Sequence, residues 1–276
     1  LLIYIIGVMA WSAAAAQVTC QPSDSLTVCR LLREAPREAD ALWFARRFVG
    51  VPYVAHTLEV NAPREQLVVN TRQMDCTTLV ETVCALLTCH RQGQRMWDDY
   101  LRALTAWRYR EGRVDGYASR LHYFSDWIDD NSRQSFVQEI QEPRPPFTGV
   151  QTIDVGYMSR HPQAYRALQL EPALIAGIIR QEQSLNGRTA RYIPKQAVDN
   201  SPLLRQVIHD GDILAITTSK QGLDIAHLGF AVWRRDGLHL LNASQLHRRV
   251  VVEPMTLGQY LQKHPSQTGI RVIRIN

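Results

Sequence analysis

Cys76 stands in the sequence Met-Asp-Cys-Thr-Thr-Leu-Val-Glu, at the start of a run that favours a helix. A thiol attacks as the thiolate, and the pKa of a free cysteine, about 8.5, falls at a helix N-terminus or beside an imidazolium. Asp75 is suited to precede the helix, so that unpaired N–H groups of the first turn would stabilise an anion on Cys76. The same groups could hydrogen-bond the oxyanion of a tetrahedral intermediate. Polar Thr77 and Thr78 favour this interpretation over a buried structural cysteine, which remains the alternative.

A thiolate needs a base, and the sequence offers nine histidines. His227 opens a predicted strand, and Gly229 follows it closely, so the imidazole could face a cleft while another backbone approaches at the glycine. Asn242, in Leu-Leu-Asn-Ala-Ser on the next predicted strand, is the candidate that orients the imidazole. Taken singly, His227 could be a surface or core residue and Asn242 a strand end. The role of His227 as base and the role of Asn242 in orienting it therefore support each other only if the two side chains meet.

The turn between these two strands tests whether His227 and Asn242 can meet. A two-residue turn at 236–237 would place Asn242 opposite Ala231. That position is four residues from His227, which is too far for a hydrogen bond. A longer loop centred near 234–235, or a bulge, would bring the two side chains opposite each other. Contact between them therefore predicts a hairpin that is not minimal.

The histidines and acids show no His-x-x-x-His or comparable spacing that is typical of a zinc site. We therefore expect no metal and no other cofactor. The net charge of +5 and the pI of about 9.1 suit an anionic partner such as a cell-wall polymer. The basic residues form no long run, so nucleic-acid binding is not expected.

Helical patterns come first along the chain, and strands follow. Helical periodicity or preference extends over residues 26–48, 76–90, 97–107 and 164–184. Strands are predicted at 65–70, 212–217, 227–233, 238–243, 249–253 and 269–275. Residues 108–154 are polar and rich in loop signals. This order predicts an α+β fold in which the helix that carries the nucleophile packs on an antiparallel sheet. Residues 91–205 form a helical and loop insertion between them.

The N-terminal segment suggests export. Residues 1–11 are almost wholly apolar and are followed by small residues, a pattern typical of a secretory signal cleaved after Ala16. The apolar run is too short to span a bilayer comfortably. We therefore expect a signal peptide at 1–16, one catalytic domain at 17–276, a periplasmic or extracellular location and no stable membrane insertion. A lipid anchor at Cys20 is the alternative, although Thr19 fits a lipobox poorly.

Export makes disulfides possible for the five cysteines. Cys20 and Cys29 are the preferred pair because they are close in the mature N-terminal stretch. Cys84 and Cys89 are predicted to lie on one helix, where they would act as buried small hydrophobes. The odd number leaves at least one thiol free, as a cysteine nucleophile requires.

Several segments together carry a family resemblance. Asp-Cys-Thr-Thr-Leu-Val-Glu, His-Leu-Gly-Phe-Ala-Val and Leu-Leu-Asn-Ala-Ser resemble the NlpC-type cell-wall hydrolases, a papain-like group. A wider set in the same order, over residues 40–276, resembles the N-acetylmuramoyl-L-alanine amidase-like branch. The set comprises Gly50-Val-Pro-Tyr53, Leu58-Glu59, Arg120-Leu-His-Tyr-Phe-Ser-Asp-Trp127, Tyr192-Ile-Pro-Lys195, Gly211-Asp-Ile213, Gly222-Leu-Asp224, Ala226-His227 and Gly269-Ile-Arg-Val-Ile-Arg274.

The resemblance implies a papain-like NlpC-type fold and hydrolysis of the amide between N-acetylmuramic acid and L-alanine. Cys76 would match the nucleophile, His227 the base and Asn242 the polar third residue. The branch often has histidine in place of Asn242, but an asparagine can still hold the imidazole tautomer by accepting a hydrogen bond. Tyr53 would lie near the thiol and assist the oxyanion. The partners would be peptidoglycan fragments, and we expect a monomer.

The segment from Arg120 to Trp127 is the predicted substrate wall. Arg120 could bind a stem-peptide carboxylate bidentately. Tyr123 or Trp127 could stack on a sugar face, unless the segment is a loop held by aromatic burial. Lys195 is a weaker candidate for carboxylate recognition. Asp224 could orient the loop before His227 or cap a turn.

Two other functions remain open. An endopeptidase that cuts after D-glutamate would use the same fold and residues. A non-catalytic wall-binding module would not need Cys76, His227 and a polar residue at 242. The insertion favours the amidase, because an added wall can select one end of a muropeptide. The stem peptide and the sugar form are left open.

Overall fold

The computed structural model describes residues 18–276, so the predicted signal peptide at 1–16 lies outside the described residues. Within the described part, none of the helices combines the length and the apolar character needed to cross a membrane.

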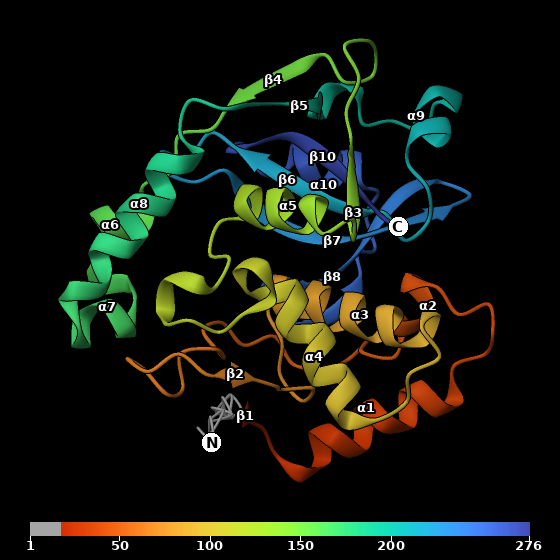
Figure 1. The fold of residues 1–276 in the computed structure, drawn as a ribbon. Coiled ribbons are helices and arrows are strands. Elements are labelled where there is room, and N and C mark those ends of the chain that lie inside the picture. Colours follow the sequence, from red (N-terminus) through yellow and green to blue (C-terminus); the bar gives the residue numbers. More distant parts are fainter. Residues whose placement is uncertain (1–17) are drawn as a thin grey trace, which may run out of the picture.

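An antiparallel sheet forms the centre of the molecule (Figure 1). In the described residues it has eight strands in the order β4-β5-β10-β6-β7-β8-β9, with β3 also paired to β10. The strands are β3 (Val137–Ile140), β4 (Gly149–Thr152), β5 (Thr189–Pro194), β6 (Ile213–Thr218), β7 (Ile225–Arg234), β8 (Gly237–Ser244), β9 (Arg249–Val252) and β10 (Gln267–Ile275). Two short strands, β1 (Val18–Thr19) and β2 (Leu67–Val68), pair in parallel apart from this sheet.

Helices cover both faces of the sheet, because successive residues of its strands alternate between two apolar clusters. One cluster lies under the N-terminal helices and α5, the other under α9 and α10. The helices of the first face are α1 (Pro22–Glu34), α2 (Ala41–Arg46), α3 (Cys76–Arg91), α4 (Trp97–Arg108) and α5 (Phe124–Arg133). Those of the second face are α9 (Pro202–Val207) and α10 (Leu257–Gln262). The sequence-based prediction of helices packed on an antiparallel sheet is confirmed.

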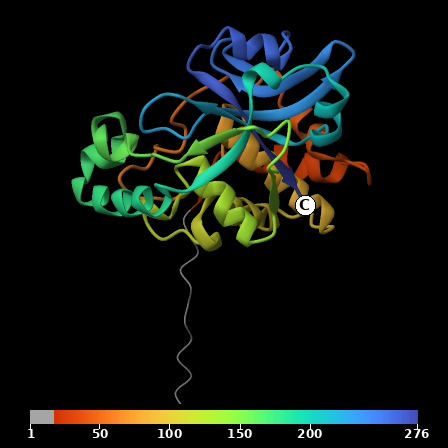
Figure 2. The same ribbon diagram turned by 90° about the horizontal axis from the view of Figure 1, so that it is seen from above.

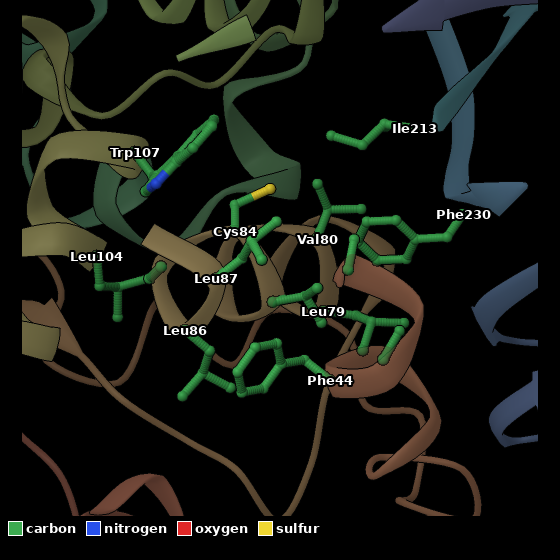
Figure 3. Packing of buried hydrophobic residues seen from close by; sticks show 14 of the residues in the cluster. Phe44, Leu79, Val80, Cys84, Leu86, Leu87, Leu104, Trp107, Ile213 and Phe230 are labelled. Carbon is green, nitrogen blue, oxygen red and sulfur yellow. The ribbon is translucent and has the colours of Figure 1, made fainter. Parts of the chain in front are cut away.

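The core of the first face forms around α3 (Figure 3). Val80 and Leu79 of α3 face Phe230 of the sheet and Phe44 of α2, and all four are fully buried. Cys84 points into the same core beside Trp107. Cys84 and Cys89 are both buried and unpaired, which confirms their predicted role as small hydrophobes.

The predicted disulfide between Cys20 and Cys29 is wrong, because both thiols are free. Cys29 lies on α1, which begins at Pro22, whereas Cys20 precedes the helix. At about 1.5 Å per residue the helix carries Cys29 about 10 Å beyond Pro22. A disulfide needs Cα atoms within about 7 Å. The helix therefore separates the two cysteines.

A small lobe stands at one side of the sheet (Figure 2). It contains α6 (Tyr157–Arg160), α7 (Arg166–Leu170) and α8 (Ile175–Leu185), which pack around their own apolar cluster. The remaining short elements are 3-10 turns at Arg110–Gly112, Tyr117–Ser119, Pro162–Ala164, Pro172–Leu174 and Lys195–Ala197.

The structure divides two segments that the periodicity predicted as single helices. The helical pattern at 26–48 becomes α1 and α2, and Pro36 lies in the break. The pattern at 164–184 becomes α7 and α8, separated by a 3-10 turn that begins at Pro172. The prediction of loops over 108–154 is wrong for α5, β3 and β4. Residues 91–205 also supply α4, which packs on α3, and three strands of the central sheet.

Candidate active site

The N-terminus of α3 places Cys76 at the first helical position. The Asp75 carboxylate accepts a 2.8 Å hydrogen bond from the backbone N–H of Thr78. The Thr78 hydroxyl accepts in return from the backbone N–H of Asp75, at 2.9 Å. This reciprocal capping box fixes where the helix begins. The partly buried thiol therefore stands on a rigid element, as the sequence predicts.

A cavity of about 200 Å³ brings Cys76 together with His227 of β7. The two residues come from elements far apart in the sequence, since α3 packs against β7. The pairing of β6 with β7 shifts register between His227 and Ile225, so Ala226 is an extra residue next to the imidazole. Such bulges redirect the neighbouring side chain at the edge of a site.

Asn242 holds the imidazole of His227. Their Nε2 and Oδ1 atoms are 2.9 Å apart, and the Asn242 amide N–H donates to the Leu240 carbonyl at 3.2 Å. The second bond orients the amide so that its oxygen faces the imidazole. An amide oxygen can only accept, so Nε2 carries the proton and Nδ1 has the free lone pair. The structure thus brings the predicted base and its predicted orienting residue together.

The hairpin achieves this contact in a way that differs from the prediction. Its turn is minimal, with two residues at 235–236, because Arg234 pairs with Gly237. The predicted longer loop is therefore wrong. Since the turn is centred one residue earlier than 236–237, the partner of each residue moves by two positions. Asn242 then lies diagonally across from His227, within reach of an imidazole.

Gly229 permits the close approach of β7 and β8. A Cβ atom at this position would lie 2.6 Å from the Leu241 carbonyl oxygen and 2.7 Å from the Leu240 side chain. Real Cβ atoms do not come so close to a backbone oxygen, so a side chain here would push the strands apart. The predicted close approach at this glycine is confirmed.

Burial has the largest effect on the pKa values of Cys76 and His227. Burial, followed by the Asp75 carboxylate, raises the pKa of the Cys76 thiol to about 12. The Leu228 N–H and the hydroxyl and N–H of Thr77 act in the opposite direction but are weaker. Burial also lowers the pKa of His227. The direction for the thiol is opposite to the lowering expected at the helix end, and the two shifts together favour a neutral thiol and a neutral imidazole at neutral pH.

Tyr53 is not among the residues that line the cavity, but its hydroxyl interacts electrostatically with Cys76. Its segment runs beside the residue that precedes Asp75, because Tyr53 bridges to Met74 and Val54 donates to the Met74 carbonyl. Burial, followed by the charges of Cys76 and Asp75, raises the pKa of the Tyr53 hydroxyl to about 12. The hydroxyl therefore stays protonated and can donate a hydrogen bond.

Arg120 does not present its charge to the cavity. The guanidinium is buried, with Nη2 2.6 Å from Glu59 Oε1 and Nε 3.2 Å from Glu65 Oε1. Two carboxylates of the protein thus occupy the groups that were predicted to bind a stem-peptide carboxylate. The prediction that Arg120 binds a stem-peptide carboxylate is wrong, because Glu59 and Glu65 already neutralise its guanidinium.

Trp127 cannot stack on a sugar, because it is fully buried. Its ring lies between those of Trp107 and Phe124, at centroid distances of 5.5 and 4.7 Å. The alternative of aromatic burial holds for this residue. Lys195 lies on a 3-10 turn and is not among the residues that line the cavity.

Tyr123 lines the cavity, but its hydroxyl is already engaged. It donates to Glu182 Oε1 at 2.7 Å and accepts from the Met158 N–H at 3.0 Å. Only the ring surface of Tyr123 is left for a ligand. These bonds also attach the lobe to the segment that precedes α5.

Asp224 connects the loop before His227 to another element. Its carboxylate accepts a 2.7 Å hydrogen bond from the Ser125 N–H in the first turn of α5. The residue is buried and lines the cavity. It therefore both orients the loop and caps a helix, and the capped helix is remote in sequence.

Sequence reasoning gave no role to several residues of the cavity wall. His122 lies inside the quoted segment Arg120–Trp127 but was not assigned a function. Met158 and Tyr165 come from the lobe, where no pattern in the sequence marks them. Within residues 18–276, no three His, Cys, Asp or Glu side chains cluster in a way that could hold a metal ion.

A family model of N-acetylmuramoyl-L-alanine amidase-like proteins matches residues 43–270. The chain belongs to this amidase-like family. Cys76, His227 and Asn242 all lie inside the matched range, so the cavity is part of the family's common region. A comparison with curated protein sequences finds no match.

Solved structures support membership of the amidase-like family. An N-acetylmuramoyl-L-alanine amidase from Bacteroides uniformis is 41% identical, with a TM-score of 0.79 over 86% of this chain and 99% of that one. A putative xylanase from Bacteroides fragilis is 40% identical, with a TM-score of 0.77 over 84% and 99% of the two chains. A Legionella pneumophila protein shares the fold, at 20% identity and a TM-score of 0.71 over 92% and 94%. The wider NlpC-type relationship stays a prediction.

Proposed function

We propose that this protein hydrolyses the amide bond between N-acetylmuramic acid and L-alanine in peptidoglycan fragments, with Cys76 as nucleophile and His227 as base. The observation that carries the proposal is the cavity that contains both residues, with His227 held by Asn242 at 2.9 Å. Membership of the amidase-like family and the 41% identical amidase support the choice of bond. The papain-like NlpC-type fold, an exported location and a monomeric state are parts of the same proposal.

The reaction begins from neutral groups. Because the thiol pKa is raised and the imidazole pKa is lowered, the proton leaves Sγ as the sulfur attacks the substrate carbonyl carbon. The free Nδ1 of His227 receives that proton, while Nε2–H keeps its bond to Asn242. Asn242 fixes the tautomer and holds the imidazole in place.

The attack produces a tetrahedral intermediate with a negatively charged oxygen. Backbone N–H groups of the first turn of α3 and the Tyr53 hydroxyl are the available donors near the thiol. The C–N bond then breaks, and His227 gives its proton to the departing amine of the L-alanyl peptide. The muramoyl group remains on Cys76 as a thioester. Water, deprotonated by His227, attacks the thioester and releases the muramic carboxylic acid and the free thiol.

The experiment uses the chain from residue 17 and a muramyl tripeptide. Mass spectrometry should detect free N-acetylmuramic acid and a peptide that begins with L-alanine. Cys76→Ala should lower kcat by at least about a thousandfold. Cys20→Ala is the matched control, since this exposed thiol lies outside the cavity and should retain full activity.

The outcomes separate the competing functions. Release of L-alanyl-D-glutamate still attached to the sugar would identify the endopeptidase instead. Binding of the tripeptide without any cleavage would identify a wall-binding module. Full hydrolysis by Cys76→Ala would contradict the mechanism itself.

A further inference from the structure

A second imidazole lines the cavity that contains Cys76 and His227. His122 lies in the segment just before α5 and shares the cavity wall with Asp224. The proposed mechanism gives it no part, because one imidazole is enough to move the proton. The cavity therefore holds a hydrogen-bonding group whose purpose the chemistry of bond cleavage does not explain.

The orientation of His122 is fixed by Tyr117. Its Nε2 atom lies 2.9 Å from the Tyr117 carbonyl oxygen, and the two rings pack at a centroid distance of 4.5 Å. A carbonyl oxygen can only accept, so Nε2 carries the proton and Nδ1 carries a lone pair. Over residues 18–276, no donor is hydrogen-bonded to Nδ1.

The surroundings keep this imidazole neutral. Burial lowers the pKa of His122 well below its ordinary value of 6.5, and the guanidinium groups of Arg120 and Arg110 lower it further. The Tyr117 carbonyl raises the pKa but does not outweigh them. Nδ1 is therefore a hydrogen-bond acceptor at neutral pH rather than a cationic donor.

Other polar groups of this wall are already engaged. The Asp224 carboxylate binds the Ser125 N–H, and the Tyr123 hydroxyl binds Glu182 and Met158. Much of the remaining lining is apolar: Phe124, Met158, Leu223, Ile225 and Leu228. Because His122 lines the cavity, a bound ligand that offers no donor to Nδ1 leaves this acceptor unsatisfied, which weakens binding.

We propose that Nδ1 of His122 accepts a hydrogen bond from an amide N–H of the bound muropeptide and so selects the substrate. This inference rests on the proposed function. Two amide N–H groups flank the scissile bond: that of the 2-acetamido group on the sugar and that of the peptide bond that follows L-alanine. Their chemistry is the same, and the experiment distinguishes them.

The experiment compares two variants on three substrates. His122→Gln can still donate from its amide to the Tyr117 carbonyl but has no acceptor at the δ position. His122→Asn places an amide oxygen near the position of Nδ1. The first substrate is the muramyl tripeptide. The second is an analogue with an ester in place of the peptide bond that follows L-alanine, and the third is an analogue with 2-O-acetyl in place of the 2-acetamido group.

For the wild type we expect kcat/KM to fall about tenfold on one of the two analogues, the value of a single hydrogen bond. The kcat/KM of His122→Gln on the parent substrate should be about tenfold below that of the wild type. On that analogue, the kcat/KM of His122→Gln should equal that of the wild type. His122→Asn should recover part of the loss. On one analogue, the fall in kcat/KM relative to the parent substrate should be present in the wild type and absent in His122→Gln. The N–H that this analogue lacks is the one that His122 binds.

Unchanged kcat/KM for His122→Gln on the parent substrate would overturn the proposal. It would also be overturned if the variant discriminated against both analogues as the wild type does. Thermal melting establishes that each variant is folded, and His122→Asn supplies the same comparison if His122→Gln is not. Failure of the proposed function is distinguishable, because the wild type would then leave the bond between the muramic acid and L-alanine intact in all three substrates.

Discussion

Cys76 and His227 line the same cavity, and the residue that orients the imidazole is uncharged. Asn242 orients the ring but carries no charge that would stabilise an imidazolium, and burial disfavours both ionised forms. The resting state is therefore a neutral thiol and a neutral imidazole. This differs from the thiolate–imidazolium pair that a helix N-terminus alone would suggest, because burial has the larger effect on both pKa values.

The neutral pair predicts the pH dependence of hydrolysis. The pKa of His227 is below 6.5, so the imidazole stays able to accept a proton until the pH falls below that value. The thiol pKa of about 12 keeps Cys76 protonated above pH 9. We expect kcat/KM to be level from about pH 6.5 to 9 and to decline only at lower pH. A profile measured with the muramyl tripeptide tests this.

An acidic midpoint at or above pH 6.5 would contradict the lowered His227 pKa. A separate measurement is alkylation by iodoacetamide, followed by peptide mapping so that Cys76 is distinguished from Cys20. Its rate at Cys76 should still be rising above pH 9. A rate that levels off near neutrality would mean that a thiolate is already present.

At the scale of elements, Asp224 links the loop before β7 to the N-terminus of α5. Its carboxylate replaces the missing side-chain cap, since Tyr123 at the N-cap position makes no such bond. Asp224 and the donor of this bond, the Ser125 N–H, are 99 positions apart. The bond therefore sets the place of a cavity wall relative to the strand that carries His227.

Replacing Asp224 with alanine should loosen this link. We expect Asp224→Ala to lower the free energy of unfolding by about 1–2 kcal/mol, the usual value of a helix cap. It should also lower kcat/KM, because the loop before His227 loses its anchor. Asp224→Asn keeps an acceptor oxygen and should recover most of the stability. Urea denaturation and hydrolysis assays measure both effects.

Asp199→Ala is the control, because this exposed carboxylate bonds only locally to the Ser201 N–H. If Asp224→Ala were no less stable than Asp199→Ala, the bond to Ser125 would not hold the wall.

Patterns in the sequence were enough to predict the elements of the site. The capping residue before Cys76 and the alternation around His227 are local signals, and they correctly placed α3, β7 and β8. The role of Asp224 in capping α5 could not be assigned, because its donor lies on a helix whose start has no local cap. Arg120 was misassigned for the same reason, since its partner Glu59 is 61 residues away. Contacts between residues so far apart produce no local pattern of residue types in the sequence.

Across the whole molecule, Glu59 joins three parts of the chain. Its Oε1 binds Arg120 at 2.6 Å and the Tyr117 hydroxyl at 3.0 Å, and its Oε2 accepts from the Ala167 N–H of the lobe at 3.2 Å. On the other side, Glu182 of the lobe accepts from Tyr123 and from the Ser159 N–H. These two carboxylates hold the lobe against the body of the protein, so Met158 and Tyr165 can form one wall of the cavity.

Glu59→Gln should weaken the attachment of the lobe. The buried Arg120 would keep only Glu65 as a charged partner, and the loss of one member of a buried ion pair costs about 3 kcal/mol. We expect a lower melting temperature and faster limited proteolysis within residues 155–188. Glu38→Gln, at an exposed glutamate, is the control. Equal proteolysis of the two variants would mean that Glu59 does not secure the lobe.

The position of β10 in the sheet has a consequence for how the chain matures. This last strand lies in the interior of the sheet, where it pairs with β6 on one edge and with β3 and β5 on the other. A growing chain therefore cannot join the two parts of this sheet until residues 267–275 have been made, and such long-range pairing is slow. The helix with Cys76 can form much earlier, because its hydrogen bonds are local. We therefore expect the cavity lined by Cys76 and His227 to reach its final form only once β10 has joined the sheet.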